Sequence, residues 1–157
     1  MKFQNESYIY NYMGNIYYHQ KKFSNALECY TKAKELAVII NDVVQIIKVN
    51  LNIAIINSEV GNYNKAIATY KELEALIDAN QLIYSQQEFL NEKCKINLNI
   101  GIAFEDYFNK NRNKTNLIDS SFYYYNKSLL FSQNDLSLKL KTLKILEIFT
   151  IIKIILI

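Results

Sequence analysis

The sequence predicts an all-α protein built from repeated antiparallel helix pairs. The 157-residue chain contains no proline and only three glycines, so few residues interrupt long helices. Apolar residues recur at spacings of three and four through most of the chain, which indicates helices with one buried face. Residues 51–73 show the clearest unit, a helix, a short turn and a second helix, and a weaker copy lies on each side. Half of the residues are hydrophobic, which is enough for a single domain over residues 1–157.

The periodic segments and the residues that begin or end helices predict seven helices. Gly61 is expected to end the third helix, and Ser85 with Glu88 has the spacing of a capping box at the start of the fifth. Further N-cap side chains are Asn41 with Asp42, before the third helix, and Asn134 with Asp135, before the seventh. The predicted helices cover residues 6–20, 23–40, 43–60, 63–79, 86–107, 117–132 and 135–157.

The helix pairs share a pattern of small and aromatic residues. The small positions are Gly14, Ala54 and Gly101 in the first helices, and Ala26, Ala66 and Ser121 in the second helices. We expect small residues where the two backbones of a pair approach. The aromatic positions beside them are Tyr17, Tyr30, Tyr70, Phe104 and Tyr125. These aromatic residues are interpreted as core, because stripes at helical period usually pack inside.

This pattern resembles the tetratricopeptide repeat. The resemblance implies a right-handed superhelix with repeats at about residues 7–40, 47–79 and 86–132, followed by a hydrophobic C-terminal helix at 135–157. Ala26 and Ala66 are 40 residues apart, whereas the usual repeat has 34. The third copy carries eight extra residues around residues 109–116. Stretched repeats of this kind are similar to those of the cytoplasmic peptide-pheromone receptors of Gram-positive bacteria.

The same resemblance implies a non-catalytic module that binds a short peptide or an extended protein segment. The receptors often carry an N-terminal helix-turn-helix domain, for which there is no room ahead of Glu6. The resemblance therefore implies a truncated relative of a pheromone-responsive transcription regulator that lacks the DNA-binding domain.

The face of each first helix that points away from the core predicts the binding surface. In a stacked array this face lines the concave side. Its residues are Tyr8, Asn11, Tyr12, Asn15 and Tyr18, then Lys48, Leu51, Asn52 and Ile55, then Lys95, Leu98, Asn99 and Ile102. Lys48 with Asn52 and Lys95 with Asn99 repeat the same pair in the same register.

Asparagine amides can pair with a peptide backbone, and a lysine one turn away can meet a carboxylate. Similar asparagine and lysine sets hold peptides in many tetratricopeptide domains, including the carboxylate-clamp type. Glu59, Glu105 and Asp106 would make the other edge of this surface acidic. The alternative is a solvated helix face, although the apolar residues on the stripe favour a ligand site.

Other classes of function find little support in the sequence. His19 is the single histidine, no phosphate loop, nucleophile motif or metal-spaced cluster is present, and no cofactor is expected. Two acidic pairs, Glu72 with Glu74 and Glu105 with Asp106, are interpreted as solvated charges. The net charge of +3 is dispersed and includes one arginine, which argues against direct nucleic-acid binding.

The compartment is predicted from the cysteines and the start of the chain. Cys29 and Cys94 are isolated, and no secretory signal is visible, so a cytoplasmic location is expected.

The apolar tail, residues 138–157, needs a separate explanation. Charged residues interrupt it too often for an ordinary membrane span, so membrane attachment is only a third hypothesis. The tail packs back on the array, or mediates homo-oligomer formation, or marks a truncated chain. A structural or assembly protein that oligomerises through this helix is the second functional hypothesis.

Overall fold

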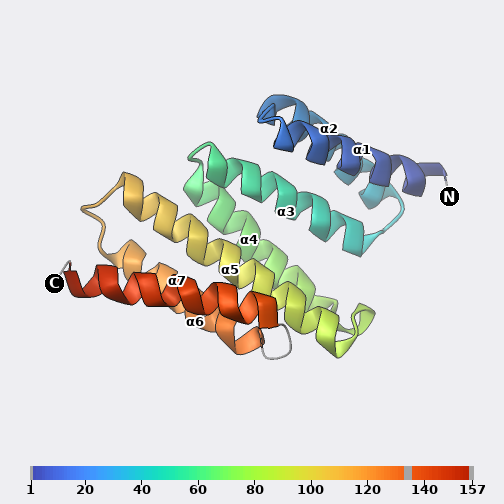
Figure 1. Ribbon diagram of the computed structural model, residues 1–157. Helices are drawn as coiled ribbons and strands as arrows, with labels where there is room; N and C mark the ends of the chain where they lie inside the picture. Colours follow the sequence, from blue (N-terminus) through green and yellow to red (C-terminus); the bar gives the residue numbers. More distant parts are fainter. Residues whose placement is uncertain (1, 133–135, 156–157) are drawn as a thin grey trace. The chain divides into compact units, whose positions relative to one another are not determined.

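The computed structural model describes residues 2–132 and 136–155 of the chain. These residues form seven α-helices and one short 3-10 helix, with no strand among them, which confirms the all-α prediction (Figure 1). The elements are α1 (Lys2–His19), α2 (Phe23–Ile39), α3 (Val43–Glu59), α4 (Tyr63–Ala79), η1 (Gln81–Ile83), α5 (Gln86–Lys110), α6 (Asn116–Phe131) and α7 (Leu136–Ile155). The chain divides into two compact units, residues 1–65 and 66–157.

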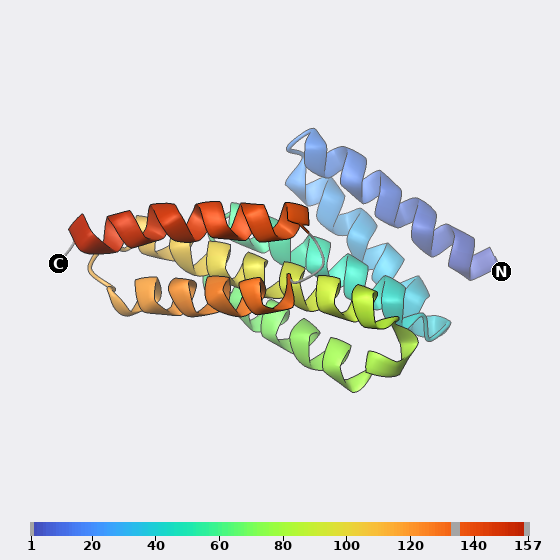
Figure 2. The same cartoon turned by 60° about the horizontal axis from the view of Figure 1, so that its bottom comes forward.

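In the first unit, α1 and α2 form an antiparallel pair, and α3 packs against both (Figure 2). The core between them combines small residues with one large ring. It contains Ala26, Tyr30 and Ala33 of α2, which pack with Val49 and Ile56 of α3. All five side chains are almost completely buried. The amphipathic pattern of the sequence therefore identified the buried side of these helices correctly.

A tyrosine ring lies against a glycine backbone in each unit. A Cβ atom added to Gly14 of α1 would lie 2.6 Å from Cδ1 of Tyr30 on α2. A Cβ added to Gly101 of α5 would lie 2.6 Å from Cδ1 of Tyr125 on α6. Carbon atoms do not approach this closely, so any side chain here would displace the ring. Small residues are thus needed at Gly14 and Gly101, and the atoms that require them belong to aromatic rings.

Three turns of the first unit share one backbone conformation. The residues after α1, α2 and α3 that adopt positive φ are Lys21 (59°), Asn41 (54°) and Gly61 (86°). In each turn the N–H of the following residue donates to the carbonyl five residues earlier in the chain, as from Lys22 to Tyr17 at 2.9 Å. These are Schellman motifs, which satisfy carbonyls at a helix end. Gly61 ends α3 as predicted, whereas the other two turns use residues that carry a side chain.

Two of the three predicted N-caps lie among the described residues. Asp42 accepts a hydrogen bond from the Gln45 backbone N–H at 3.0 Å, and Ser85 forms a complete capping box with Glu88. Both predictions are confirmed. The third, Asn134 with Asp135, lies outside the described residues.

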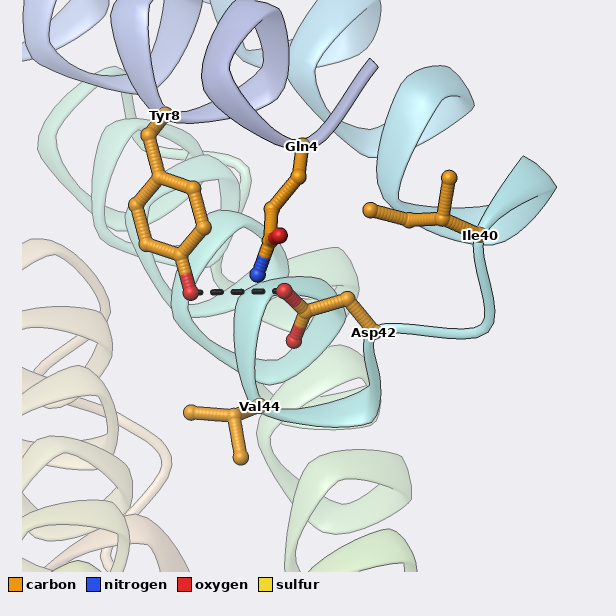
Figure 3. A pocket seen from close by; sticks show the side chains of 5 residues that line it. All are labelled: Gln4, Tyr8, Ile40, Asp42 and Val44. Carbon is orange, nitrogen blue, oxygen red and sulfur yellow. Dashed lines mark hydrogen bonds between the residues drawn. The ribbon is translucent and has the colours of Figure 1, made fainter. Parts of the chain in front are cut away.

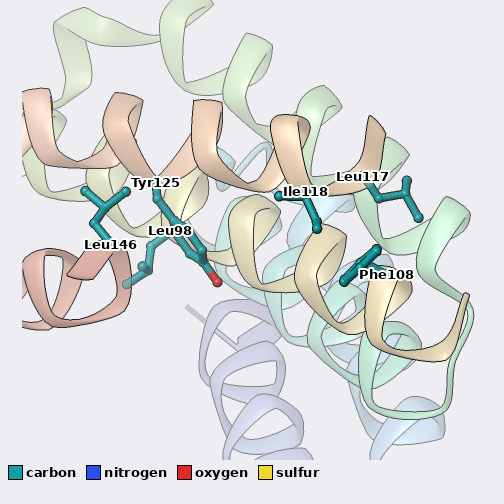
Figure 4. Packing of buried hydrophobic residues seen from close by; sticks show 6 residues of the cluster. All are labelled: Leu98, Phe108, Leu117, Ile118, Tyr125 and Leu146. Atoms are coloured by element: carbon teal, nitrogen blue, oxygen red, sulfur yellow. The ribbon is translucent and has the colours of Figure 1, made fainter. Parts of the chain in front are cut away.

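In the second unit, α5 and α6 form the hairpin and α7 packs on both of them (Figure 1). The core cluster contains Leu98, Phe108, Leu117, Ile118, Tyr125 and Leu146 (Figure 4). Because Phe108 is 3% exposed and contributes to this core, α5 continues beyond the predicted end at residue 107. Leu146 of α7 joins the same cluster, so the apolar tail packs back on its own unit, as one of the three explanations expected. None of the helices, over the residues described, has the length and apolar character needed to cross a membrane.

Replacing Gly14 or Gly101 with alanine tests the ring-on-glycine contact. Each substitution should lower the free energy of unfolding by about 1 to 3 kcal/mol, because the added methyl group overlaps a buried ring. Denaturant titration followed by circular dichroism measures this change. In a Tyr30→Leu background, Gly14→Ala should cost clearly less, since the ring is gone. The same cost in both backgrounds would contradict the proposed contact.

Candidate functional site

Three asparagines of the first unit form one hydrogen-bond network. Asn52 of α3 donates through Nδ2 to Oδ1 of Asn11 at 3.0 Å and to Oδ1 of Asn15 at 3.2 Å, both on α1. The Tyr30 hydroxyl of α2 donates to the same Asn15 oxygen at 2.8 Å. Burial raises the pKa of Tyr30 to about 12, so the hydroxyl stays protonated and keeps donating at neutral pH. Helices α1 and α3 therefore bring together the three asparagines that the sequence placed on one face. Asn11 is buried, with 8% of its surface exposed, so the prediction of a fully open face is wrong at this residue.

This network uses only part of each amide. Asn11 and Asn15 accept through their oxygens, and no described residue bonds to their Nδ2 groups. Asn52 donates through Nδ2, and its Oδ1 likewise has no partner in the described part of the chain. Because an amide group combines two N–H donors with an acceptor, donors and an acceptor remain at one place. That combination suits the N–H and C=O groups of a peptide backbone.

A pocket of about 230 Å³ lies beside the network. Its lining residues are Asn15, Tyr18, His19, Tyr30, Asn52 and Ile55. At its edge the Tyr18 hydroxyl donates to Glu59 at 3.2 Å, and Lys21 lies 3.8 Å from the same carboxylate. Burial, with the nearby Glu59 charge, raises the pKa of Tyr18. The pocket thus combines amide, aromatic and apolar groups with a charged edge.

A second cavity of about 520 Å³ lies between the first turns of α1 and α3 (Figure 3). Its lining residues are Gln4, Tyr8, Ile40, Asp42 and Val44. Asp42 accepts a hydrogen bond from the Tyr8 hydroxyl at 3.3 Å through one oxygen and caps α3 through the other. Burial, together with Asp42, raises the pKa of Tyr8. Asp42 has no ion pair with any described residue, so this cavity offers a negative charge to a cationic group.

The remaining predicted site residues of the first unit differ in exposure. Tyr12 is 63% exposed and Lys48 is also exposed, whereas Leu51 and Ile55 are half-buried. Such partly covered apolar side chains next to the amide network are available for contact with a ligand.

The predicted site residues of the second unit also differ in how far they are exposed. Lys95 is exposed and pairs with Glu92 at 2.9 Å, and Asn99 is half-buried. Ile102 is half-buried and packs against the core. Leu98 is only 3% exposed, because Leu146 of α7 lies in the same cluster. The prediction of an open surface at Leu98 is therefore wrong.

The second unit contains a buried ion-pair cluster that was not predicted from the sequence. Lys93 of α5 is 5% exposed, and its Nζ lies 3.0 Å from Glu74 Oε1 and 2.7 Å from Asp78 Oδ2 on α4. Lys127 of α6 lies 2.8 Å from Glu74, and Asn97 donates to it at 2.9 Å. The interpretation of Glu74 as a solvated charge is therefore wrong. The signal in the sequence was a lysine and an asparagine on the otherwise apolar stripe of the fifth helix.

The electrostatics of this cluster indicate a structural role. Burial alone would raise the pKa of Glu74, but hydrogen bonds from Lys127, Asn97 and Lys93 outweigh it and lower the pKa to about 2. A carboxylate held this firmly in its charged form is poorly suited to proton transfer near neutral pH.

Glu105 also differs from the prediction of a solvated charge. It is half-buried and accepts a hydrogen bond from Tyr125 at 2.5 Å, and burial raises its pKa.

Groups for metal or nucleophilic chemistry are not assembled within the described residues. No cluster of three or more histidine, cysteine, aspartate or glutamate side chains that could hold a metal occurs there. Cys29 and Cys94 are free and buried. His19 lines the 230 Å³ pocket and is exposed, which fits a contact residue better than a general base.

The Glu74 cluster predicts a specific pH dependence. The pKa of Glu74 is lower in the folded state than the ordinary glutamate value of 4.5, so the stabilising contribution of this carboxylate is present above pH 4.5. It is lost as the pH falls from 4.5 towards 2, by up to about 3 kcal/mol. Denaturant titrations between pH 3 and pH 7 should show a smaller loss on acidification for Glu74→Gln than for the wild type. The exposed neighbour Glu72→Gln is the matched control, and equal pH profiles for all three proteins would refute the assignment.

Comparison with known proteins agrees with the helix-pair architecture. Residues 6–78 match the family model described as tetratricopeptide repeat. The matched segment begins in α1 and ends in α4, so it spans the first two repeats aligned in the sequence. No curated protein matches the chain. The tetratricopeptide family is generally a non-enzymatic scaffold for protein interactions. Over residues 6–78 the chain is therefore similar to the tetratricopeptide repeat, which suggests a protein-interaction module.

Proposed function

We propose that the first unit binds a short peptide or an extended protein segment along the face shared by α1 and α3. The main observation behind this proposal is the network of Asn11, Asn15 and Asn52, which has unused donors and an acceptor. Two of these asparagines line the 230 Å³ pocket, and the 520 Å³ cavity lies near the starts of the same two helices. Because these groups match a peptide backbone, they would hold an extended chain whatever its side chains. The tetratricopeptide match supports this kind of ligand.

The spacing of the two pockets suggests the length of peptide in contact. Tyr8 and Tyr18 mark the two pockets and are ten residues apart on α1, which corresponds to about 15 Å along a helix. An extended chain covers this distance with about four or five residues. A cationic group at one end of the peptide would fit the cavity that contains Asp42. Backbone groups in the middle would meet the asparagines.

We also propose a second contact site and a relationship to a class of regulators. Lys95 and Asn99 of α5 are proposed as a separate contact of the second unit, because they repeat the spacing of Lys48 and Asn52. A relationship to peptide-pheromone-responsive regulators is supported by the 40-residue step between Ala26 and Ala66. Such a relationship would make a short linear signalling peptide the ligand.

Substitution of Asn52 tests the binding site. Peptides selected on the wild-type chain from a random display library should bind Asn52→Ala more weakly by about 1 to 3 kcal/mol, because a partly buried partner set is lost. Fluorescence anisotropy with the selected peptides measures the dissociation constants.

Asn25→Ala provides the matched control, because Asn25 is exposed on α2 and away from both pockets. It should bind as the wild type does, and both variants should show the wild-type circular dichroism spectrum. Peptides that bind Asn52→Ala and the wild type equally would rule out this location for the site.

A further inference from the structure

Helix α7 presents apolar side chains in two different directions. Thr142, Ile145 and Leu146 point inward, and Leu146 belongs to the core formed with α5 and α6. Among the described side chains of α7, six other large apolar ones are between 41% and 71% exposed: Leu136, Leu140, Leu143, Ile148, Ile151 and Ile154. We call these six residues the outer row of α7. Exposed apolar patches of this extent commonly mark interaction sites.

The outer row is nearly symmetric about the middle of the helix. Leu140 and Ile151 are equally far from the midpoint between residues 145 and 146, and so are Leu143 and Ile148. Leu136 and Ile154 lie near the two ends, one position away from an exact match. A twofold dimer needs a surface that is complementary to itself, and a mirror-like order of side chains along a helix provides one for an antiparallel pair.

One pair of opposite charges on the same helix follows the same symmetry. Lys144 and Glu147 are exposed and also equally far from the midpoint. Neither forms an ion pair with any described residue. Glu147 lies among the residues of the outer row, so covering this surface would take its carboxylate out of water, which is unfavourable without a cationic partner. In an antiparallel pair of α7 helices, each Glu147 would lie opposite Lys144 of the other copy.

We propose that the outer row of α7 is a docking surface for a second copy of this chain, with the two α7 helices antiparallel. Leucines of one half of each helix pack against isoleucines of the opposite half of its partner. Two Lys144–Glu147 contacts form per dimer and select this orientation and register, because a parallel or shifted pair would lose them. A lipid surface would satisfy the apolar side chains but would leave Glu147 without a partner.

The size of the surface predicts a weak dimer. Covering six partly exposed leucine and isoleucine side chains buries roughly 500 Å² per copy and about 1,000 Å² in total, which is at the lower limit for specific interfaces. Association should therefore be reversible and depend on protein concentration. The surface lies in the second unit and is independent of the peptide site proposed for the first.

Exchange of the two charges tests the orientation. Sedimentation equilibrium of the full chain over a range of concentrations gives the dimer dissociation constant. Glu147→Lys and Lys144→Glu should each weaken dimerisation by about tenfold, because like charges then face each other twice. The double variant restores opposite charges and should return to within about threefold of the wild type. Lys139→Glu, an exposed lysine with no charged residue at the corresponding position, is the control and should change little.

Three results would overturn the proposal. The wild-type chain would remain monomeric at all concentrations, or the double variant would be as weak as the two single variants. Alternatively, the monomeric chain would co-sediment with anionic phospholipid vesicles, which would identify a lipid surface as the occupant. Circular dichroism of each variant confirms that the helices are intact, so that loss of dimerisation reports on the surface.

Discussion

The packing of a tyrosine ring on a glycine backbone organises the helix pairs of both units. Tyr30 covers Gly14 in the first unit, and Tyr125 covers Gly101 in the second. Each ring is almost fully buried and occupies the space that a side chain on the facing helix would need. The two helices can therefore approach closely only where the small residue and the ring coincide. This requirement constrains how the two helices of each pair are aligned.

The same tyrosines connect the scaffold to the polar groups of each unit. The Tyr30 hydroxyl reaches Asn15, whose oxygen is shared with Asn52, so the core of the first unit orients the proposed peptide-binding amides. The Tyr125 hydroxyl instead donates to Glu105, a half-buried carboxylate. The same packing of a tyrosine ring on glycine thus supports a partly unsatisfied amide network in the first unit and a tyrosine–carboxylate hydrogen bond in the second.

Helix positions could be predicted closely from the sequence because they depend on local spacing. Periodic apolar residues located all seven helices, and the side chains of Asp42 and Ser85 identified two helix starts correctly. The turn after α1 was harder to recognise, since Lys21 adopts the left-handed conformation that glycine adopts in the turn after α3. The length of α5 also departed from prediction, because Phe108 extends the helix by packing against residues of α6.

The sequence by itself determined the helices, their repeated pairing and the common face of Asn11, Asn15 and Asn52, because these follow from spacing along one chain segment. Only the tertiary structure decided which polar groups bond to each other. It placed Asn52 against two asparagines that precede it by 41 and 37 residues, and it buried Lys93 against Glu74. It also covered Leu98 with a residue of α7. Hydrogen bonding, ion pairing and burial depend on neighbours distant in sequence, and helical periodicity carries no information about which neighbours those are.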